Sequence, residues 1–322
     1  MIRGRYAPSP TGELHLGNLR TAVLSWLFAH AADSETESGE LLYRIEDLDA
    51  SRVRPGMAEA QRRDLDALGL TFDPPTIVQS ERFAGYDAAL DALTSAGRTF
   101  PCFCTRREIA EAASAPHPTD SYPTKAPSTG LRATGLRATP GRYPGTCRNL
   151  SAAVRAERAR TRTPALRLRA EPAEVTIFDL LHGEVTGRPD DIVLRRNDGV
   201  AAYNLAVVVD DADTSVTQVV RGEDLLDSAI SQAYLARLLG RAVPTYAHVP
   251  LAVNAEGRRL AKRDGAVTLA DLAERGVGAI EVLTMIAASL GLSTADERVS
   301  PGQLLERFDP AALPRTPWIV GT

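Results

Sequence analysis

The chain has 322 residues, of which 44% are hydrophobic and 24% are charged, and its formal net charge is −4. This composition is typical of a folded globular protein and argues against disorder and against a chain that is basic throughout. Three cysteines in so long a chain do not form a disulfide framework. The sequence has neither an apolar leader nor an apolar run of membrane-spanning length. We therefore expect a cytoplasmic protein with no membrane partner, and a monomer.

Strands and helices alternate through residues 1–98. The chain begins with a short strand that breaks at Pro8 and Pro10, and residues 19–32 carry apolar side chains at helical spacing. Residues 39–49 predict a second strand, 56–70 an amphipathic helix and 77–97 a further helix. This alternation favours an α/β fold with a doubly wound parallel sheet of the Rossmann type.

The alternation stops between residues 99 and 189, which we interpret as an insertion large enough to be a small domain. It begins at the sequence CFC, continues through a run rich in proline, serine and threonine, and ends in a basic stretch. Residues 125–169 contain eleven basic residues and one acidic residue, Glu157. Such a stretch is either a solvated basic surface or a surface for a polyanion.

The α/β pattern resumes over residues 190–258. The apolar run 205–211 predicts a buried strand that ends in two acids. Residues 215–220 predict another strand and residues 224–240 a helix. A basic loop and a mostly helical region follow over residues 259–322.

Two short segments have the composition of a nucleotide site. The sequence HLGN places His15 and Gly17 between a strand and the start of a helix, where backbone N–H groups attract anions. The sequence GRRLAKRDGA places Arg259 and Lys262 in a basic loop that could hold a polyphosphate. Either segment alone is weak evidence, because ordinary turns and solvated loops have the same composition.

Together, in this order, the two segments resemble the HIGH and KMSKS motifs of class I aminoacyl-tRNA synthetases. The sequences RYAPSPTGELHLGNLRTA, RIEDLD, YNLAVVVDD and VRGEDLLDS are similar to those of the glutamyl branch, and the resemblance covers nearly the whole chain. It implies a catalytic domain split into two halves, 1–98 and 190–258, by an acceptor-type insertion, 99–189. A stem-contact-like helical region, 259–322, would follow.

The resemblance implies a pocket for L-glutamate. It assigns six residues to that pocket: Arg5, Ala7, Ser9, Glu46, Tyr203 and Arg221. Two arginines and one acid match the two carboxylates and one ammonium of glutamate, a charge argument that does not depend on the family. Each residue taken singly is as well explained by a structural ion pair.

The resemblance also implies a site for Mg-ATP. His15 and Lys262 would be catalytic and would stabilise the phosphates, and Gly17, Asn18 and Arg259 would complete the nucleotide site. No general base is needed, because the attacking carboxylate is already ionised at neutral pH, and positioning and electrostatics should dominate. Ala261 stands where the family has the serine of its second motif, so one phosphate contact is absent.

Two features resemble the shorter glutamyl-queuosine tRNA(Asp) synthetases. We expect no anticodon-binding domain after the catalytic body, and Val207 replaces an expected asparagine. The resemblance implies transfer of glutamate to queuosine in the anticodon loop of tRNA(Asp), with the basic insertion facing the tRNA. The alternatives are a truncated glutamyl-tRNA synthetase that charges tRNA(Glu), a nucleotidyltransferase with the same early motif, and a non-catalytic RNA-binding relic.

The three cysteines bracket the insertion. Cys102 and Cys104 lie at its start and Cys147 beyond its loop, around a stretch with few apolar residues, where a metal could supply the missing cross-link. Tetrahedral zinc needs a fourth ligand. By resemblance this is Tyr143, giving one structural zinc. His117 and Asp120 are the alternatives.

Overall fold

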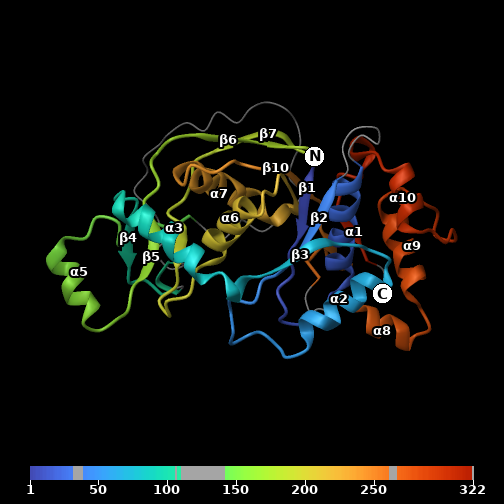
Figure 1. The fold of residues 1–322 in the computed structure, drawn as a ribbon, viewed down its shortest axis with the longest axis horizontal. Helices are drawn as coiled ribbons and strands as arrows, with labels where there is room; N and C mark the ends of the chain where they lie inside the picture. The colour runs from blue at the N-terminus through green and yellow to red at the C-terminus, as the bar shows by residue number, and fades with distance from the viewer. Residues whose placement is uncertain (32–38, 106, 110–141, 261–266, 321–322) are drawn as a thin grey trace.

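The structure is a computed structural model that describes residues 1–320 apart from 32–38, 106, 110–141 and 261–266. It confirms the predicted α/β class, with mixed parallel sheets covered by helices (Figure 1). Within the described ranges, no helix is both long enough and apolar enough to cross a membrane.

The first sheet contains β1 (Arg3–Tyr6), β2 (Glu40–Ile45) and β3 (Asp73–Val78), all parallel. Helix α1 (Leu16–His30) connects β1 to β2 and is buried along most of its length, as its apolar composition requires. Helix α2 (Met57–Ala67) follows β2, and Gly69 takes a positive φ of 76° beyond its end.

The second sheet has the order β7-β6-β10-β9. Its strands are β6 (Val175–Asp179), β7 (Gly183–Gly187), β9 (Gln218–Gly222) and β10 (Thr245–Val249). Strands β6, β10 and β9 are parallel, and β7 pairs antiparallel with β6. The Thr217 N–H donates to the Arg3 carbonyl at 2.9 Å, so the start of β9 lies beside β1 and the two sheets adjoin.

A third, antiparallel sheet lies at one end of the molecule. It contains β4 (Thr99–Cys102), β5 (Ala165–Leu168) and β8 (Val193–Arg195), and helix α5 (Ala152–Ala159) projects beyond it (Figure 1). Strands β6 and β7 also fall within residues 99–189, but they pair in the second sheet.

The remaining elements cover the sheets. Helices α3 (Phe83–Ser95), α6 (Tyr203–Asp213) and α7 (Leu226–Leu238) form a packed layer. The short 3₁₀ turns are η1 (Gln79–Glu81), η2 (Glu223–Leu225) and η4 (Pro310–Ala312). The C-terminal region contains α8 (Leu269–Glu274), α9 (Ala279–Ser289) and α10 (Pro301–Arg307), and β12 (Trp318–Ile319) pairs with β11 (Ala252–Val253).

Two local predictions are wrong. Residues 205–211 form most of helix α6 rather than a strand, because a short, wholly apolar run fits a helix buried between α3 and α7 as well as it fits a strand. The helix predicted over 77–97 begins only at Phe83. Ile77 and Val78 end β3, where they pair with Arg44 and Ile45.

Candidate active site and metal centre

The HLGN turn forms the N-terminus of α1. The His15 side chain caps the helix, with Nδ1 accepting from the N–H groups of Gly17 at 3.1 Å and Asn18 at 3.3 Å. Because Nδ1 is an acceptor, a neutral His15 carries its proton on Nε2. The Asn18 side chain accepts from the His15 N–H in return. A Cβ at Gly17 would lie 3.0 Å from His15 and 3.3 Å from Ala252, so this position needs glycine.

Both described ends of the basic loop approach this turn. Leu260 donates its N–H to the carbonyl of Ala252, the residue next to Gly17. On the other side of the loop, Thr268 forms a β-bridge with His15. Lys262 and Ala261 themselves lie outside the described residues, and Arg259 forms an exposed ion pair with Asp224. The turn therefore lies beside both described ends of the loop.

Arg5 belongs to a buried chain of ion pairs. Its Nε donates to Asp211 of α6 at 3.2 Å, and Arg44 of β2 donates to the same carboxylate oxygen at 2.5 Å. Arg44 also donates to Glu46 at 3.1 Å. Arg5 and Arg44 are 5% and 1% exposed, so removal of one partner would leave a buried charge without compensation.

The charges in this chain shift the pKa values of its two acids in opposite directions. Burial alone would raise the pKa of Asp211, but the cations of Arg44 and Arg5 outweigh it and lower that pKa. Burial dominates at Glu46 and raises its pKa despite the same two arginines. Asp211 is therefore the acid that holds both cations, while Glu46 is the more readily protonated one.

Arg221 of β9 is held differently, by neutral acceptors. It donates from Nε to His248 Nε2 at 3.0 Å, from Nη1 to Gln232 Oε1 at 2.8 Å and from Nη2 to the Leu225 carbonyl at 3.2 Å. The ion pairs of the described residues do not include Arg221, and its side chain is almost completely buried. We call these three acceptors the neutral cradle of Arg221.

The His248 ring is fixed by Asp179. Its Nδ1 lies 2.6 Å from Asp179 Oδ2, and the carboxylate also accepts the His248 backbone N–H. Burial lowers the pKa of His248, so the ring is neutral, with its proton on the side of Asp179 and Nε2 left to accept from Arg221.

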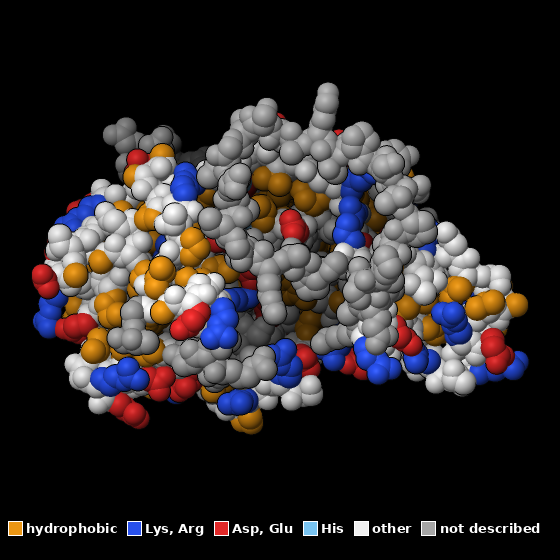
Figure 2. Space-filling view, turned by 180° about the vertical axis from the view of Figure 1, so that it is seen from behind, with side chains coloured by type: hydrophobic (Ala, Val, Ile, Leu, Met, Phe, Trp, Pro, Cys, Tyr) orange, Lys and Arg blue, Asp and Glu red, His pale blue; other side chains and the backbone are white. Residues whose placement is uncertain are grey.

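A cavity of about 710 Å³ opens between the segments that follow the strands of the first sheet and the third, antiparallel sheet. Its walls include Ser9, Glu46 and Tyr203 from the predicted glutamate pocket, together with Cys102 and Cys104. This volume is in the usual range for a small-molecule site. Figure 2 shows acidic, basic and apolar side chains close together near the middle of one face of the molecule.

The other residues of the predicted glutamate pocket are not among those that line this cavity. Arg5 and Arg221 do not line this cavity, because their guanidinium groups point to the partners described above. Ala7 is half-buried in the loop after β1. Val207 is buried in α6, where it borders a separate cavity of about 20 Å³, large enough for one water molecule.

Sequence reasoning missed four residues of this region: Arg44, Asp211, Gln232 and His248. The first two had a visible signal, since Arg44 is two residues before Glu46 and Asp211 ends an otherwise apolar run. Gln232 and His248 carried no signal in the sequence. With Arg44 and Asp211 included, three arginines and two acids give the region a formal charge of +1, which complements the net −1 of glutamate.

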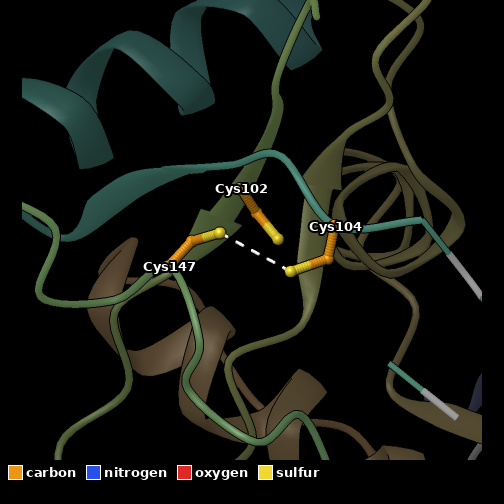
Figure 3. Close-up of side chains that lie close together, drawn as sticks. All are labelled: Cys102, Cys104 and Cys147. Atoms are coloured by element: carbon orange, nitrogen blue, oxygen red, sulfur yellow. Dashed lines mark hydrogen bonds between the residues drawn. The ribbon is translucent and has the colours of Figure 1, made fainter. Parts of the chain in front are cut away.

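The three cysteines come together at the base of the insertion (Figure 3). Their sulfur atoms lie within 4.8 Å of one another, and Cys104 Sγ is 3.5 Å from Cys147 Sγ. Zn–S bonds of 2.3 Å in a tetrahedron place sulfur atoms about 3.8 Å apart. The thiols therefore have the spacing that tetrahedral zinc requires.

The Tyr143 hydroxyl occupies the fourth side of this group. It lies 3.3 Å from Cys102 Sγ and 3.9 Å from Cys104 Sγ, and it accepts the Cys147 N–H at 2.8 Å. His117 and Asp120, the other possible ligands, lie outside the described residues. The donor set thus fits zinc, and Tyr143 is the fourth donor among the described residues.

Two thiols of the group differ in acidity. Burial, together with the hydrogen bond to Cys147, raises the pKa of Cys104 to about 12. Burial alone would also raise the pKa of Cys147, but the Phe103 N–H and the Cys104 thiol outweigh it and lower that pKa. Of these two thiols, Cys147 therefore loses its proton to a metal more readily than Cys104.

Comparisons with known proteins agree over most of the chain. A family model described as "tRNA synthetases class I (E and Q), catalytic domain" matches residues 1–303. A glutamyl-Q tRNA(Asp) synthetase from Nocardia farcinica is 54% identical over 98% of this chain and 92% of its own length. A protein of the same name from Cutibacterium acnes is 45% identical over 98% of this chain and 82% of its own length.

Solved structures share the fold. A glutamate-tRNA synthetase from Elizabethkingia anophelis has a TM-score of 0.76 at 25% identity, covering 99% of this chain and 68% of that chain. A glutamate tRNA ligase from Elizabethkingia meningosepticum, solved in complex with its amino acid, has a TM-score of 0.75 at 24% identity, covering 99% of this chain and 66% of that chain.

Proposed function

Because the chain belongs to the glutamate and glutamine branch of the class I tRNA synthetases, a family of ligases, we propose that it activates L-glutamate with Mg-ATP and transfers the glutamate to queuosine in the anticodon loop of tRNA(Asp). The family membership expected from the sequence motifs is confirmed by these matches. The observation that carries the finer proposal is the 54% identity to a glutamyl-Q tRNA(Asp) synthetase over almost the whole chain.

The first step would join glutamate to AMP. A carboxylate oxygen of glutamate attacks the α-phosphorus of ATP, the bond between the α- and β-phosphates breaks, and pyrophosphate leaves. His15 supports this proposal, since its Nδ1 caps the N-terminus of α1 and its Nε2 carries a proton that could be donated to an anionic phosphate. Lys262 and Arg259 would neutralise the pyrophosphate as it leaves.

The amino acid would lie between the charged groups of the two parallel sheets. Glu46 would receive its ammonium, Arg5 and Arg221 its two carboxylates, and Ala7, Ser9 and Tyr203 would complete the walls. The formal charge of +1 on the buried residues supports a ligand with a net charge of −1. Binding would require Arg5 to exchange part of its contact with Asp211 for the substrate.

The second step would be an esterification. A hydroxyl group of queuosine attacks the carbonyl carbon of glutamyl-adenylate, and AMP leaves. We further propose that Cys102, Cys104, Tyr143 and Cys147 hold one structural zinc, which keeps the insertion in shape next to the cavity. When bound, zinc would supply a cross-link between β4 and the segment that contains Cys147.

Two measurements test the function. We expect ATP–pyrophosphate exchange that depends on glutamate and needs no tRNA, and transfer of labelled glutamate to tRNA(Asp) only when it contains queuosine. Charging of tRNA(Glu) with no label on queuosine would identify a truncated glutamyl-tRNA synthetase. ATP–pyrophosphate exchange that does not depend on glutamate would identify a nucleotidyltransferase. Binding of tRNA without any pyrophosphate exchange would identify an RNA-binding relic.

A further inference from the structure

Two arginines of the basic stretch contact members of the cysteine cluster. Arg158, in α5, lies with Nη1 3.7 Å from Cys147 Sγ. Arg167, in β5, stacks with its guanidinium carbon 3.9 Å from the centre of the Tyr143 ring. Part of the charge that marked this stretch as a surface for a polyanion is therefore directed at two members of the cluster.

Neighbouring arginines already have acidic partners. Arg160 pairs with Glu157 at 3.0 Å, and Arg162 with Glu108 at 3.1 Å. None of the ion pairs formed by the described residues includes Arg158 or Arg167. Both signs of charge lie at the end of the molecule that carries α5, on the right in Figure 2. The two arginines thus differ from Arg160 and Arg162 in lacking a carboxylate partner in the described part of the chain.

Arg167 is also fixed in place. It is 8% exposed, and its Nη1 donates to the Asp191 carbonyl at 2.7 Å, a neutral acceptor that leaves its charge intact. A guanidinium stacked on a ring at this distance stabilises electron density in that ring, and the effect grows when the ring becomes a phenolate. A buried, anchored cation of this kind is poorly placed to meet a tRNA phosphate.

The charges of a loaded site explain these contacts. Three thiolates and one phenolate contribute −4, a divalent metal +2, and the sum is −2. A net charge of −2 in a largely buried site is unfavourable unless cations lie beside it. Arg158 and Arg167 contribute +2, one next to a sulfur ligand and one on the ring of the oxygen ligand.

We propose that Arg158 and Arg167 are positioning residues of the metal centre, which neutralise the loaded cluster and hold Tyr143 and Cys147 toward the metal. This role rests on the proposed zinc site and is separate from adenylation. The glutamate-dependent pyrophosphate exchange of the wild type tests the proposed function independently, so the two can fail separately.

The experiment compares zinc retention in three variants of the full chain. Arg167→Gln and Arg158→Gln remove the two cations, and Arg160→Gln is the matched control, because it removes an exposed arginine of the same stretch that already has a partner. Zinc content is measured by mass spectrometry and zinc release by a chromogenic chelator. We expect zinc release at least about tenfold faster than wild type in the first two variants, because each leaves one negative charge of the loaded cluster without its cation, and no change in the control.

Two further readouts separate a charge effect from general damage. With Co²⁺ in place of zinc, the sulfur-to-metal absorption band should weaken or shift in both variants, while Arg158→Lys, which keeps the charge, should restore retention. The salt dependence of tRNA binding should be unchanged in Arg167→Gln. The proposal is overturned if wild-type protein holds no zinc, if both variants retain zinc as the wild type does, or if they lose tRNA affinity with zinc retention unchanged.

Discussion

The proposed glutamate pocket and the cysteine cluster both place arginines beside groups that are or can become anionic, but they balance the charge differently. In the pocket, Arg5 and Arg44 share the carboxylate of Asp211, so the protein supplies both signs of charge itself. In the cluster, Arg158 and Arg167 face a thiol and a phenol, which become anionic only when they lose protons. The pocket should therefore hold its shape without a ligand, whereas the cluster should depend on its metal.

The largest expected effect is the removal of metal from the cluster. Structural zinc in small domains contributes on the order of 10 kcal/mol of binding free energy, and here it would link β4 to Cys147 across a sheet of three short strands. Treatment with a strong chelator should increase hydrogen exchange in β4, β5 and the segment around Cys147. Exchange in β1 and β9 should stay unchanged. If chelation increased hydrogen exchange equally in the cluster strands and in β1 and β9, the cluster would not depend on metal more than the pocket does.

The next effect is a break in the charge balance of the pocket. Asp211→Asn leaves Arg5 and Arg44 buried without their shared anion, and we expect a loss of about 3–5 kcal/mol in the free energy of unfolding by urea. Asp213→Asn is the control, because the Asp213 carboxylate lies in the same helix but is 35% exposed and pairs at the surface. That control should cost no more than about 1 kcal/mol. Similar losses in both variants would show that Asp211 has no special role.

The sequence predicted those features that depend on a short pattern of neighbouring residues, and it did not predict contacts between distant segments. The spacing of Cys102, Cys104 and Cys147 predicted a cluster that the structure brings together, and the turn at His15 lies beside Thr268, which follows the basic loop in the chain. These predictions rested on composition and order along the chain. The acid that holds the pocket together could not be found in this way, because Asp211 meets Arg5 and Arg44 only after α6 packs against the first sheet.

The misassigned strand has the same origin. A run of leucine, alanine and valine is compatible with any buried element, and the neighbours that decide between helix and strand, α3 and α7, are 110 residues before it and 15 residues after it. The neutral cradle of Arg221 could not be predicted from the sequence either, because Gln232 and His248 lie in a helix and a strand that contain no recognisable motif. Burial and pairing across the sheets, rather than local preference, fixed these residues.

A smaller effect concerns the neutral cradle of Arg221. Gln232→Glu keeps the shape of the side chain but gives Arg221 an anionic partner, which would compete with a substrate carboxylate. We expect the KM for glutamate in pyrophosphate exchange to rise about tenfold, corresponding to about 1.4 kcal/mol, with the KM for ATP unchanged. Gln303→Glu, in the first turn of α10, adds the same charge in the C-terminal helical region and should change neither constant. An unchanged KM for glutamate in Gln232→Glu would mean that the charge of Arg221 does not select the substrate.

The smallest expected effect concerns His182, which lies beyond the neutral cradle and contacts it only through Asp179. It tests whether the charge of His182 contributes to the stability of this region. Asp179 accepts from His248 on one side and from the partly exposed His182 on the other, where Nδ1 lies 3.0 Å from Asp179 Oδ1. The hydrogen bond to Asp179 raises the pKa of His182 above its unfolded value, near 6.5. The stabilisation is therefore complete below about pH 6.5 and is lost as the pH rises through the folded pKa.

His182→Gln keeps a hydrogen-bond donor but removes the titrating charge. We expect the wild type to exceed this variant in unfolding free energy at pH 5.5 by less than about 1 kcal/mol, because solvent screens the pair, and the difference to shrink at pH 8.5. Burial lowers the pKa of His248 below 6.5 whereas Asp179 raises that of His182 above it, so the loss of charge above pH 6.5 is assigned to His182. If the difference in unfolding free energy were the same at the two pH values, the hydrogen bond from His182 to Asp179 would stabilise the fold, but the charge of His182 would not. The groups whose charges interact in the pocket would then not include His182.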